Sequence, residues 1–188
     1  MKLNKLIAIA TISLLSGGIS MAQKALNLED IVAGNVIQTK GVGSMTWLKD
    51  GERYSRLENN KQTGGTDIVA YQAKDNSREV IIPSSLLTDK STGKPIPVRS
   101  ISWSADNEKV LIYNNTQRVW RYDTRGDYWV LNLKDGALRQ LGKGMPESSM
   151  MFAKFSPDGT RVAYVSNNNI YVEDIDSVSY THLRAHET

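Results

Sequence analysis

The stretch Phe155-Ser156-Pro157-Asp158-Gly159-Thr160-Arg161-Val162-Ala163-Tyr164-Val165 decides the fold of this chain. Its proline presets φ, its aspartate can bond its own backbone and its glycine accepts positive φ, so these three residues predict a tight turn. The residues after the turn suit a pleated, half-buried strand. The stretch therefore predicts a β-hairpin.

The same pattern occurs twice earlier in the chain. An aromatic residue precedes a polar turn and an apolar strand from Trp103 to Tyr113 and, more loosely, from Trp47 to Tyr54. The aromatic residues at positions 47, 103 and 155 lie 56 and 52 residues apart, near the roughly 40 to 50 residues of a four-stranded propeller blade. We therefore predict an all-β fold, a partial β-propeller of about three four-stranded blades.

Turn signals between the apolar runs indicate where the strands of each blade lie. The expected strands are 42–48, 52–57, 67–72 and 79–82 in the first blade, 99–103, 109–114, 128–133 and 137–141 in the second, and 151–155, 161–166 and 169–173 in the third. Residues 90–97 are expected to form a loop between blades, and 117–127 a loop within the second blade. The last blade is expected to be incomplete, because a fourth strand is due after Asp174 to Asp176 and the pattern stops there.

The amino-terminal end is typical of a secretory signal peptide. Residues 1–22 have a positively charged start, an apolar centre from Leu6 to Leu15 and a small-x-small site at Ser20-Met21-Ala22. The apolar run is shorter than the roughly 20 residues that span a bilayer, which favours cleavage over a membrane anchor. We expect export to the periplasm or cell surface of a bacterium. Residues 23–40 are a lead-in segment with one or two helical turns, and 41–176 the partial propeller.

Residues 177–188 do not continue the blade pattern and resemble a translated sequencing adapter or cloning scar, so we predict a non-native tail. Both histidines of the chain, His182 and His186, lie in this tail. They are four residues apart and would share one face of a helix. We nevertheless predict no metal site and no cofactor, because no cysteine and no second pair of ligands accompany them.

The composition argues against catalysis by this chain alone. It contains no cysteine, and no histidine outside the tail, so a serine or cysteine nucleophile activated by imidazole is excluded from residues 23–176. The Gly-x-Ser-x-Gly elbow is absent, and Gly41-Val42-Gly43 lacks the remaining residues of a phosphate-binding loop. The formal net charge of +3 indicates no partner class. We predict no catalytic residue, no nucleic-acid partner and no activity of the chain alone.

The most unusual stretch is 117–127, which contains Arg118, Trp120, Arg121 and Tyr122 where a minimal turn would suffice. A guanidinium flanked by aromatic rings suits the binding of a carbonyl or carboxylate, since its fork of donors is rigid. The alternative is a solvated, salt-bridged loop whose aromatic rings pack onto the blade. Composition alone leaves both interpretations open.

Three stretches resemble dipeptidyl peptidase IV proteins. Residues 26–34, Leu-Asn-Leu-Glu-Asp-Ile-Val-Ala-Gly, are similar to the mature start of the bacterial members. Trp120-Arg121, followed by the strand Tyr128 to Leu133, resembles an early blade of that family, and Phe155 to Val172 resembles the next blade. The resemblance covers Leu26 to about Asp176.

The resemblance implies a full-length parent that is a secreted serine exopeptidase, releasing dipeptides with proline or alanine in second place from a free amino terminus. It implies that Arg121 binds the peptide substrate near its amino-terminal residue. The glutamate pair that captures the free amine and the Ser-Asp-His triad would lie in later parts of the parent. Tyr122 to Arg125 depart from the hydroxyl-rich run usual there, so dipeptidyl and tripeptidyl specificities both stay open, as does a homodimer of the parent.

Two other functions are open from the sequence. One is a periplasmic propeller of the Tol-associated type, which binds proteins without catalysis. The other is a free-standing surface binding module. The first predicts further blades without a hydrolase domain, so the gene beyond residue 176 distinguishes it from the peptidase interpretation.

Overall fold

The structure is a computed structural model that describes residues 27–28, 32, 41, 43–177 and 180–183. The chain divides into two units, Met1–Gly41 and Val42–Thr188. The predicted signal peptide lies outside the described residues, as does most of the predicted lead-in segment, in which Leu28 and Val32 are helical and exposed. Among the described residues, no helix is long and apolar enough to cross a membrane.

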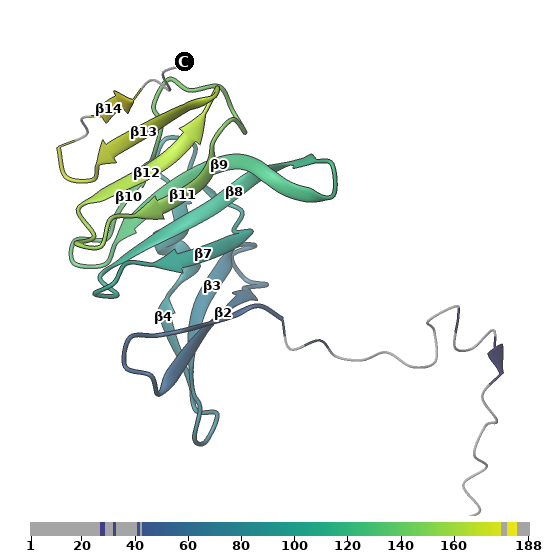
Figure 1. Ribbon diagram of the computed structural model, residues 1–188. Coiled ribbons are helices and arrows are strands. Elements are labelled where there is room, and N and C mark those ends of the chain that lie inside the picture. Colours follow the sequence, from purple (N-terminus) through teal and green to yellow (C-terminus); the bar gives the residue numbers. More distant parts are fainter. Residues whose placement is uncertain (1–26, 29–31, 33–40, 42, 178–179, 184–188) are drawn as a thin grey trace, which may run out of the picture. The chain divides into compact units, whose positions relative to one another are not determined.

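The second unit contains three antiparallel sheets of four strands each (Figure 1). Blade 1 is formed by β1 (Met45–Trp47), β2 (Arg53–Asn59), β3 (Thr66–Gln72) and β4 (Arg78–Ile82). Blade 2 is formed by β7 (Ser100–Trp103), β8 (Lys109–Val119), β9 (Tyr122–Asn132) and β10 (Ala137–Gln140), and blade 3 by β11 (Met151–Phe155), β12 (Arg161–Ser166), β13 (Asn169–Asp174) and β14 (Tyr180–Leu183). In each blade, strands adjacent in sequence are neighbours in the sheet. The predicted all-β partial propeller is confirmed.

The predicted turn chemistry closes the first hairpin of every blade. In blade 3, the carboxylate of Asp158 accepts hydrogen bonds from the Ser156 hydroxyl at 2.5 Å and the Thr160 backbone N–H at 3.0 Å. The corresponding carboxylates of Asp50 and Asp106 also accept the backbone N–H two residues further on, each at 3.0 Å. A short polar turn with its own aspartate is therefore the local cause of the repeat.

Acid should destabilise the folded chain through these turns. Hydrogen bonds from the Ser156 hydroxyl and from Thr160 lower the pKa of Asp158 to about 2, whereas an unfolded aspartate has a pKa of about 3.9. Because the folded pKa is the lower one, this contribution is complete above about pH 4 and is lost as the pH falls through about 2. Thermal melts between pH 5 and pH 2 should show a smaller acid-induced fall in Tm for Asp158→Asn than for the unchanged chain. Equal falls would contradict this assignment.

The connection between blades 1 and 2 is more ordered than the predicted loop at 90–97. A 3₁₀ turn, η1 (Ser84–Leu87), precedes a short ribbon of β5 (Thr88–Asp89) and β6 (Lys94–Pro95). Asp67, in β3, accepts the Ser84 backbone N–H at 2.7 Å and so connects η1 to blade 1.

Blade 3 differs from the expected unfinished blade. Its fourth position is filled by β14, which lies in the predicted non-native tail and pairs with β13 through Tyr171↔His182. The physical reason is that the free edge of β13 offers unpaired N–H and C=O groups, with which a short segment of β-compatible residues can pair. The non-native origin of the tail stays a prediction.

Two apolar clusters hold the blades together. Blade 1 packs on blade 2 through a cluster that includes Ile68, Val110 and Ile112, and blade 2 packs on blade 3 through one that includes Leu111 and Tyr164. Successive residues of β8 therefore face opposite neighbours. This explains why Val110 to Ile112 form an unbroken apolar run, since blade 2 is buried on both faces.

Candidate functional site

The predicted loop at 117–127 is wrong in its structure, because these residues continue β8 and β9 as a paired hairpin. Val119 pairs with Tyr122, which leaves a turn of only two residues, Trp120 and Arg121. We call the projecting part of this hairpin, residues 115–126, the arm; it extends beyond the sheets in Figure 1. The sequence offered no glycine or proline signal for so tight a turn, which is why a loop was expected.

The tip of the arm is exposed and has an unusual backbone. Trp120 has a φ of 62°, in the left-handed region that most L residues avoid, and the first position of a two-residue turn of this kind usually holds glycine. The side chain of Trp120 is 94% exposed and that of Tyr122 74% exposed. The alternative in which these rings pack onto the blade is therefore wrong. Strained backbone that the surrounding structure maintains is common at functional sites.

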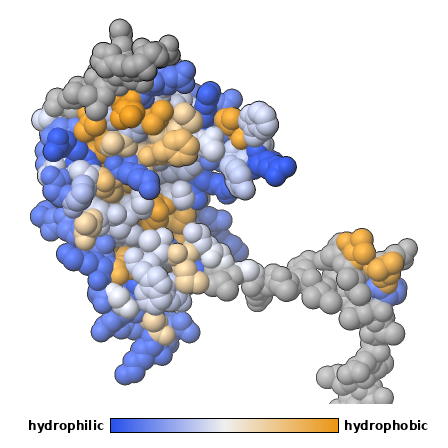
Figure 2. Space-filling model, viewed as in Figure 1, coloured by the Kyte–Doolittle hydropathy of each residue, from blue (hydrophilic) through white to orange (hydrophobic). Residues whose placement is uncertain are grey.

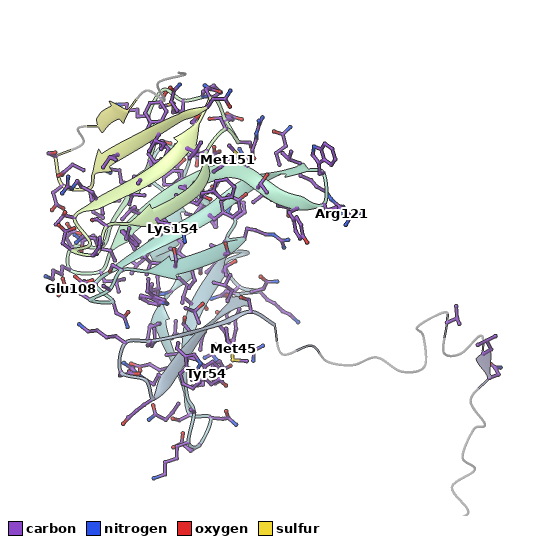
Figure 3. All side chains as sticks on the ribbon, viewed as in Figure 1. Met45, Tyr54, Glu108, Arg121, Met151 and Lys154 are labelled. Atoms are coloured by element: carbon purple, nitrogen blue, oxygen red, sulfur yellow. The ribbon has the colours of Figure 1, made fainter. Side chains whose placement is uncertain are left out.

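Arg121 lies at this tip, and Figure 3 shows it pointing away from the sheets. In the part of the chain that the structure describes, the Arg121 guanidinium forms no hydrogen bond or ion pair, and the same holds for Arg118 and Arg125 on the two strands of the arm. In Figure 2 the projecting arm shows blue, hydrophilic atoms at its end beside pale and orange ones. An unpaired, planar fork of donors can bind a carbonyl or carboxylate group.

Tyr113 contacts the root of the arm, the part next to the pair Asn114↔Asp127 at which the arm leaves the sheet. Its hydroxyl lies 2.9 Å from the backbone oxygen of Arg125 and 3.1 Å from that of Asp123, and donates to them. Its ring stacks on Tyr128, with the ring centroids 4.8 Å apart. Burial, with smaller contributions from Tyr128 and Asp123, raises the pKa of Tyr113 to about 12. The phenol is therefore a protonated donor across the physiological pH range.

Gly126 allows the root to approach the blade closely. A Cβ atom at this position would overlap the Tyr113 ring and would lie 2.6 Å from the backbone oxygen of Asn114. The backbone of Gly126 also forms two hydrogen bonds with Met150, at 3.0 and 3.1 Å, just before β11 begins. The root is thus connected to blade 3 as well as to blade 2.

Three further polar contacts hold the arm and its root. The buried carboxylate of Asp127 accepts the Asn115 side-chain amide at 2.7 Å and the Ser148 backbone N–H at 2.8 Å. Higher on the arm, Arg99 forms an ion pair with Asp123 at 3.1 Å. The contacts from Ser148 and Arg99 reach the hairpin from outside it, so they fix the arm relative to its surroundings.

A cleft of about 540 Å³ lies between the inner strands β7 and β11, away from the arm tip. It is lined in part by Trp103 and Phe155, the aromatic residues of the repeat. In the described ranges, no group of three or more His, Cys, Asp or Glu side chains could hold a metal ion. Among the residues that line this cleft, Lys154 is the one charged side chain, so the cleft holds no cluster of titratable groups.

The sequence predicts Arg121 as a binding residue but did not indicate the residues that hold the arm. Tyr113 and Asp127 read as an ordinary strand tyrosine and a turn aspartate. The one available signal was Gly126 between Arg125 and Asp127, since a glycine beside a strand suggests a close backbone approach. Its contact partner could not be named from the sequence.

Comparison with known proteins connects this architecture to one family. The model described as "Dipeptidyl peptidase IV (DPP IV) N-terminal region" matches residues 104–184, which include the whole arm. A probable dipeptidyl-aminopeptidase B of Aspergillus oryzae is 27% identical over 131 residues, covering 69% of this chain and 14% of that protein. Dipeptidyl aminopeptidase B of Saccharomyces cerevisiae is 28% identical over 152 residues, covering 76% and 17%.

A solved structure has the same fold. The crystal structure of Porphyromonas gingivalis dipeptidyl peptidase 4 superposes with a TM-score of 0.65 and 20% identity, covering 87% of this chain and 22% of that chain. This chain spans less than a fifth of the length of the two curated relatives above.

Proposed function

Because residues 104–184 match the dipeptidyl peptidase IV amino-terminal region, we propose that the blades of this chain begin the propeller of a longer, secreted serine exopeptidase. The small share of each relative that the chain spans supports a longer parent. The lack of an imidazole-activated nucleophile in residues 23–176 supports a catalytic domain elsewhere in that parent. The parent removes dipeptides with proline or alanine in second place from a free amino terminus.

In this parent, the arm binds the peptide. Arg121 donates hydrogen bonds to a backbone carbonyl near the amino-terminal residue of the substrate. The observation that carries this role is the unpaired guanidinium at the tip of an arm whose root is fixed by buried contacts. Because the backbone of the arm is already held in place, less entropy is lost when the arm binds, so the same hydrogen bonds contribute more affinity.

Replacing Arg121 by alanine in the full-length parent should raise the KM for a chromogenic X-Pro substrate about tenfold to a hundredfold, because a hydrogen bond to a charged donor contributes about 1.5 to 3 kcal/mol. The kcat should change less, since Arg121 does not touch the reacting bond. Arg118→Ala, which removes the same charge from the strand beside the tip, is the matched control and should leave KM within about twofold. Equal KM values for Arg121→Ala and the unchanged parent would overturn the assignment.

The longer parent is tested by the gene itself. Reading the natural gene beyond residue 176 should reveal further blades and then a hydrolase domain with a Gly-x-Ser-x-Gly elbow. Further blades without that domain would instead favour a Tol-associated type of binding propeller. A natural stop codon at this point would contradict both.

Export is part of the same proposal. Residues 1–22 direct the chain across the membrane and are then removed. Mass spectrometry of the parent from its native cells should find a mature amino terminus at Gln23, in the periplasmic or surface fraction. An intact Met1 in the cytoplasmic fraction would contradict export.

A further inference from the structure

The direction of the arm is not fixed by strand pairing alone. Beyond the regular pair Asn114↔Asp127, the register of β8 against β9 shifts twice, between Asn114 and Gln117 and again between Gln117 and Arg118. Each shift interrupts the ladder, and bulged strands bend and twist. A hairpin with two consecutive shifts therefore needs contacts from outside the ladder to hold one direction.

Tyr113 provides these contacts at the level of the shifts. It stands on β8 one residue before the regular pairing ends, and its hydroxyl donates to the backbone oxygens of Asp123 and Arg125. These two oxygens flank Thr124, which, like Gly126, has no β8 partner in this register. The phenol thus adds hydrogen bonds from β8 to β9 at the place where the register shifts.

The surroundings of Tyr113 leave its ring little freedom. One face stacks on Tyr128, and the space next to the other edge is open only because Gly126 has no side chain. The hydroxyl position is therefore set by buried groups of blade 2, and the two carbonyl groups of the arm follow it.

We propose that Tyr113 is a positioning residue that sets the direction of the arm and, through it, the place of the Arg121 guanidinium for the peptide. Tyr113 itself does not touch the substrate. The inference rests on the proposed function of Arg121 and extends it to a residue eight positions away.

The test is Tyr113→Phe in the full-length parent, which keeps the ring and removes both hydrogen bonds to the arm. We expect KM for an X-Pro substrate to rise about threefold to tenfold, as for the loss of one or two neutral hydrogen bonds, with kcat unchanged. Amide hydrogen exchange in residues 115–126 should become faster. Tyr54→Phe is the matched control, since Tyr54 also stacks on a tyrosine and donates to Asn76 at 3.3 Å, but in blade 1.

A double variant distinguishes positioning from a general loss of stability. If Tyr113 acts through Arg121, adding Tyr113→Phe to Arg121→Ala should raise KM no further than Arg121→Ala alone. If Tyr113→Phe raised KM a further threefold or more in the Arg121→Ala variant, the inference would be overturned. It would also be overturned if Tyr113→Phe alone left KM unchanged while Arg121→Ala raised it. An unchanged KM for Arg121→Ala would overturn the proposed function instead, and the exchange rates would then decide whether Tyr113 fixes the arm.

Discussion

Replacing Glu173 by glutamine is expected to lower the free energy of unfolding by about 3 kcal/mol, the lower end of the range for breaking a buried ion pair. Glu173 is 3% exposed and forms an ion pair with Arg139 at 3.2 Å. Its other carboxylate oxygen accepts the Gly142 backbone N–H at 2.9 Å and the Tyr164 hydroxyl at 3.2 Å. One carboxylate thus joins β10 and the following loop of blade 2 to two strands of blade 3.

The cost arises mainly at Arg139. Its Nε and Nη1 atoms are buried and have no hydrogen-bond partner in the structure, and one Nη2 bond goes to the backbone oxygen of Asp174. Glutamine keeps the shape of the side chain but removes the counter-charge, which leaves a largely buried cation unpaired. The Arg139 side chain as a whole is still 23% exposed, and we therefore expect the lower end of the range.

Urea unfolding followed by circular dichroism measures this difference. Glu79→Gln is the control, because Glu79 is 67% exposed and its ion pair with Arg53 is expected to contribute less than about 1 kcal/mol. The double variant Arg139→Met with Glu173→Gln should lose less than the sum of the single losses, since neither charge is then left alone. A Glu173→Gln loss no larger than that of Glu79→Gln would contradict the argument.

The blade repeat could be predicted because its causes are local. The aspartates at positions 50, 106 and 158 each bond to a backbone N–H two residues away, so the chemistry of a few consecutive residues determines each hairpin. Strand positions followed from the turns. The fourth strand of blade 3 could not be foreseen. A segment pairs with the free edge of β13 mainly because that edge offers unpaired backbone groups, and the sequence of the added segment matters little.

The candidate site could be predicted only in part, because its geometry depends on distant contacts. Arg121 was proposed from the resemblance of Trp120-Arg121 to a known family, yet the arm that presents it depends on Tyr113 and on the bridge from Gly126 to Met150. Glu173 and Arg139 likewise lie 34 positions apart and read as ordinary surface charges. No periodicity connects such residues, so only the folded backbone brings them together.

Gly126→Ala is expected to destabilise the chain by about 3 kcal/mol, at the upper end of the cost of overpacking. Two effects oppose each other at this position. Glycine in a strand is less favourable than alanine by about 0.5 to 1 kcal/mol, so local propensity alone would predict stabilisation. The added methyl group, however, would overlap the Tyr113 ring and lie 2.6 Å from the Asn114 backbone oxygen, whereas ordinary contacts begin at 3.4 Å.

The steric clash should outweigh the gain in strand propensity, because neither the Tyr113 ring nor the Asn114 backbone oxygen can move freely. The Tyr113 ring is stacked on Tyr128, and the Asn114 oxygen belongs to the backbone of β8. Relief requires Gly126 to shift, which would break its two hydrogen bonds to Met150 and release the root of the arm. Destabilisation should therefore be accompanied by faster amide exchange in the arm.

The control is Gly41→Ala, since a Cβ atom there has nothing within 4 Å and its φ is not positive. It should leave the free energy of unfolding unchanged or raise it slightly, because alanine restricts the unfolded chain. A second variant tests whether the Tyr113 ring is the cause. Tyr113→Leu removes the ring, so Gly126→Ala should lower the free energy of unfolding less in the Tyr113→Leu variant than in the unchanged chain. If Gly126→Ala and Gly41→Ala instead unfolded at the same urea concentration, the close approach of Tyr113 would not explain the glycine at position 126. The arm would then have to be held by Asp127 and the strand pairing alone.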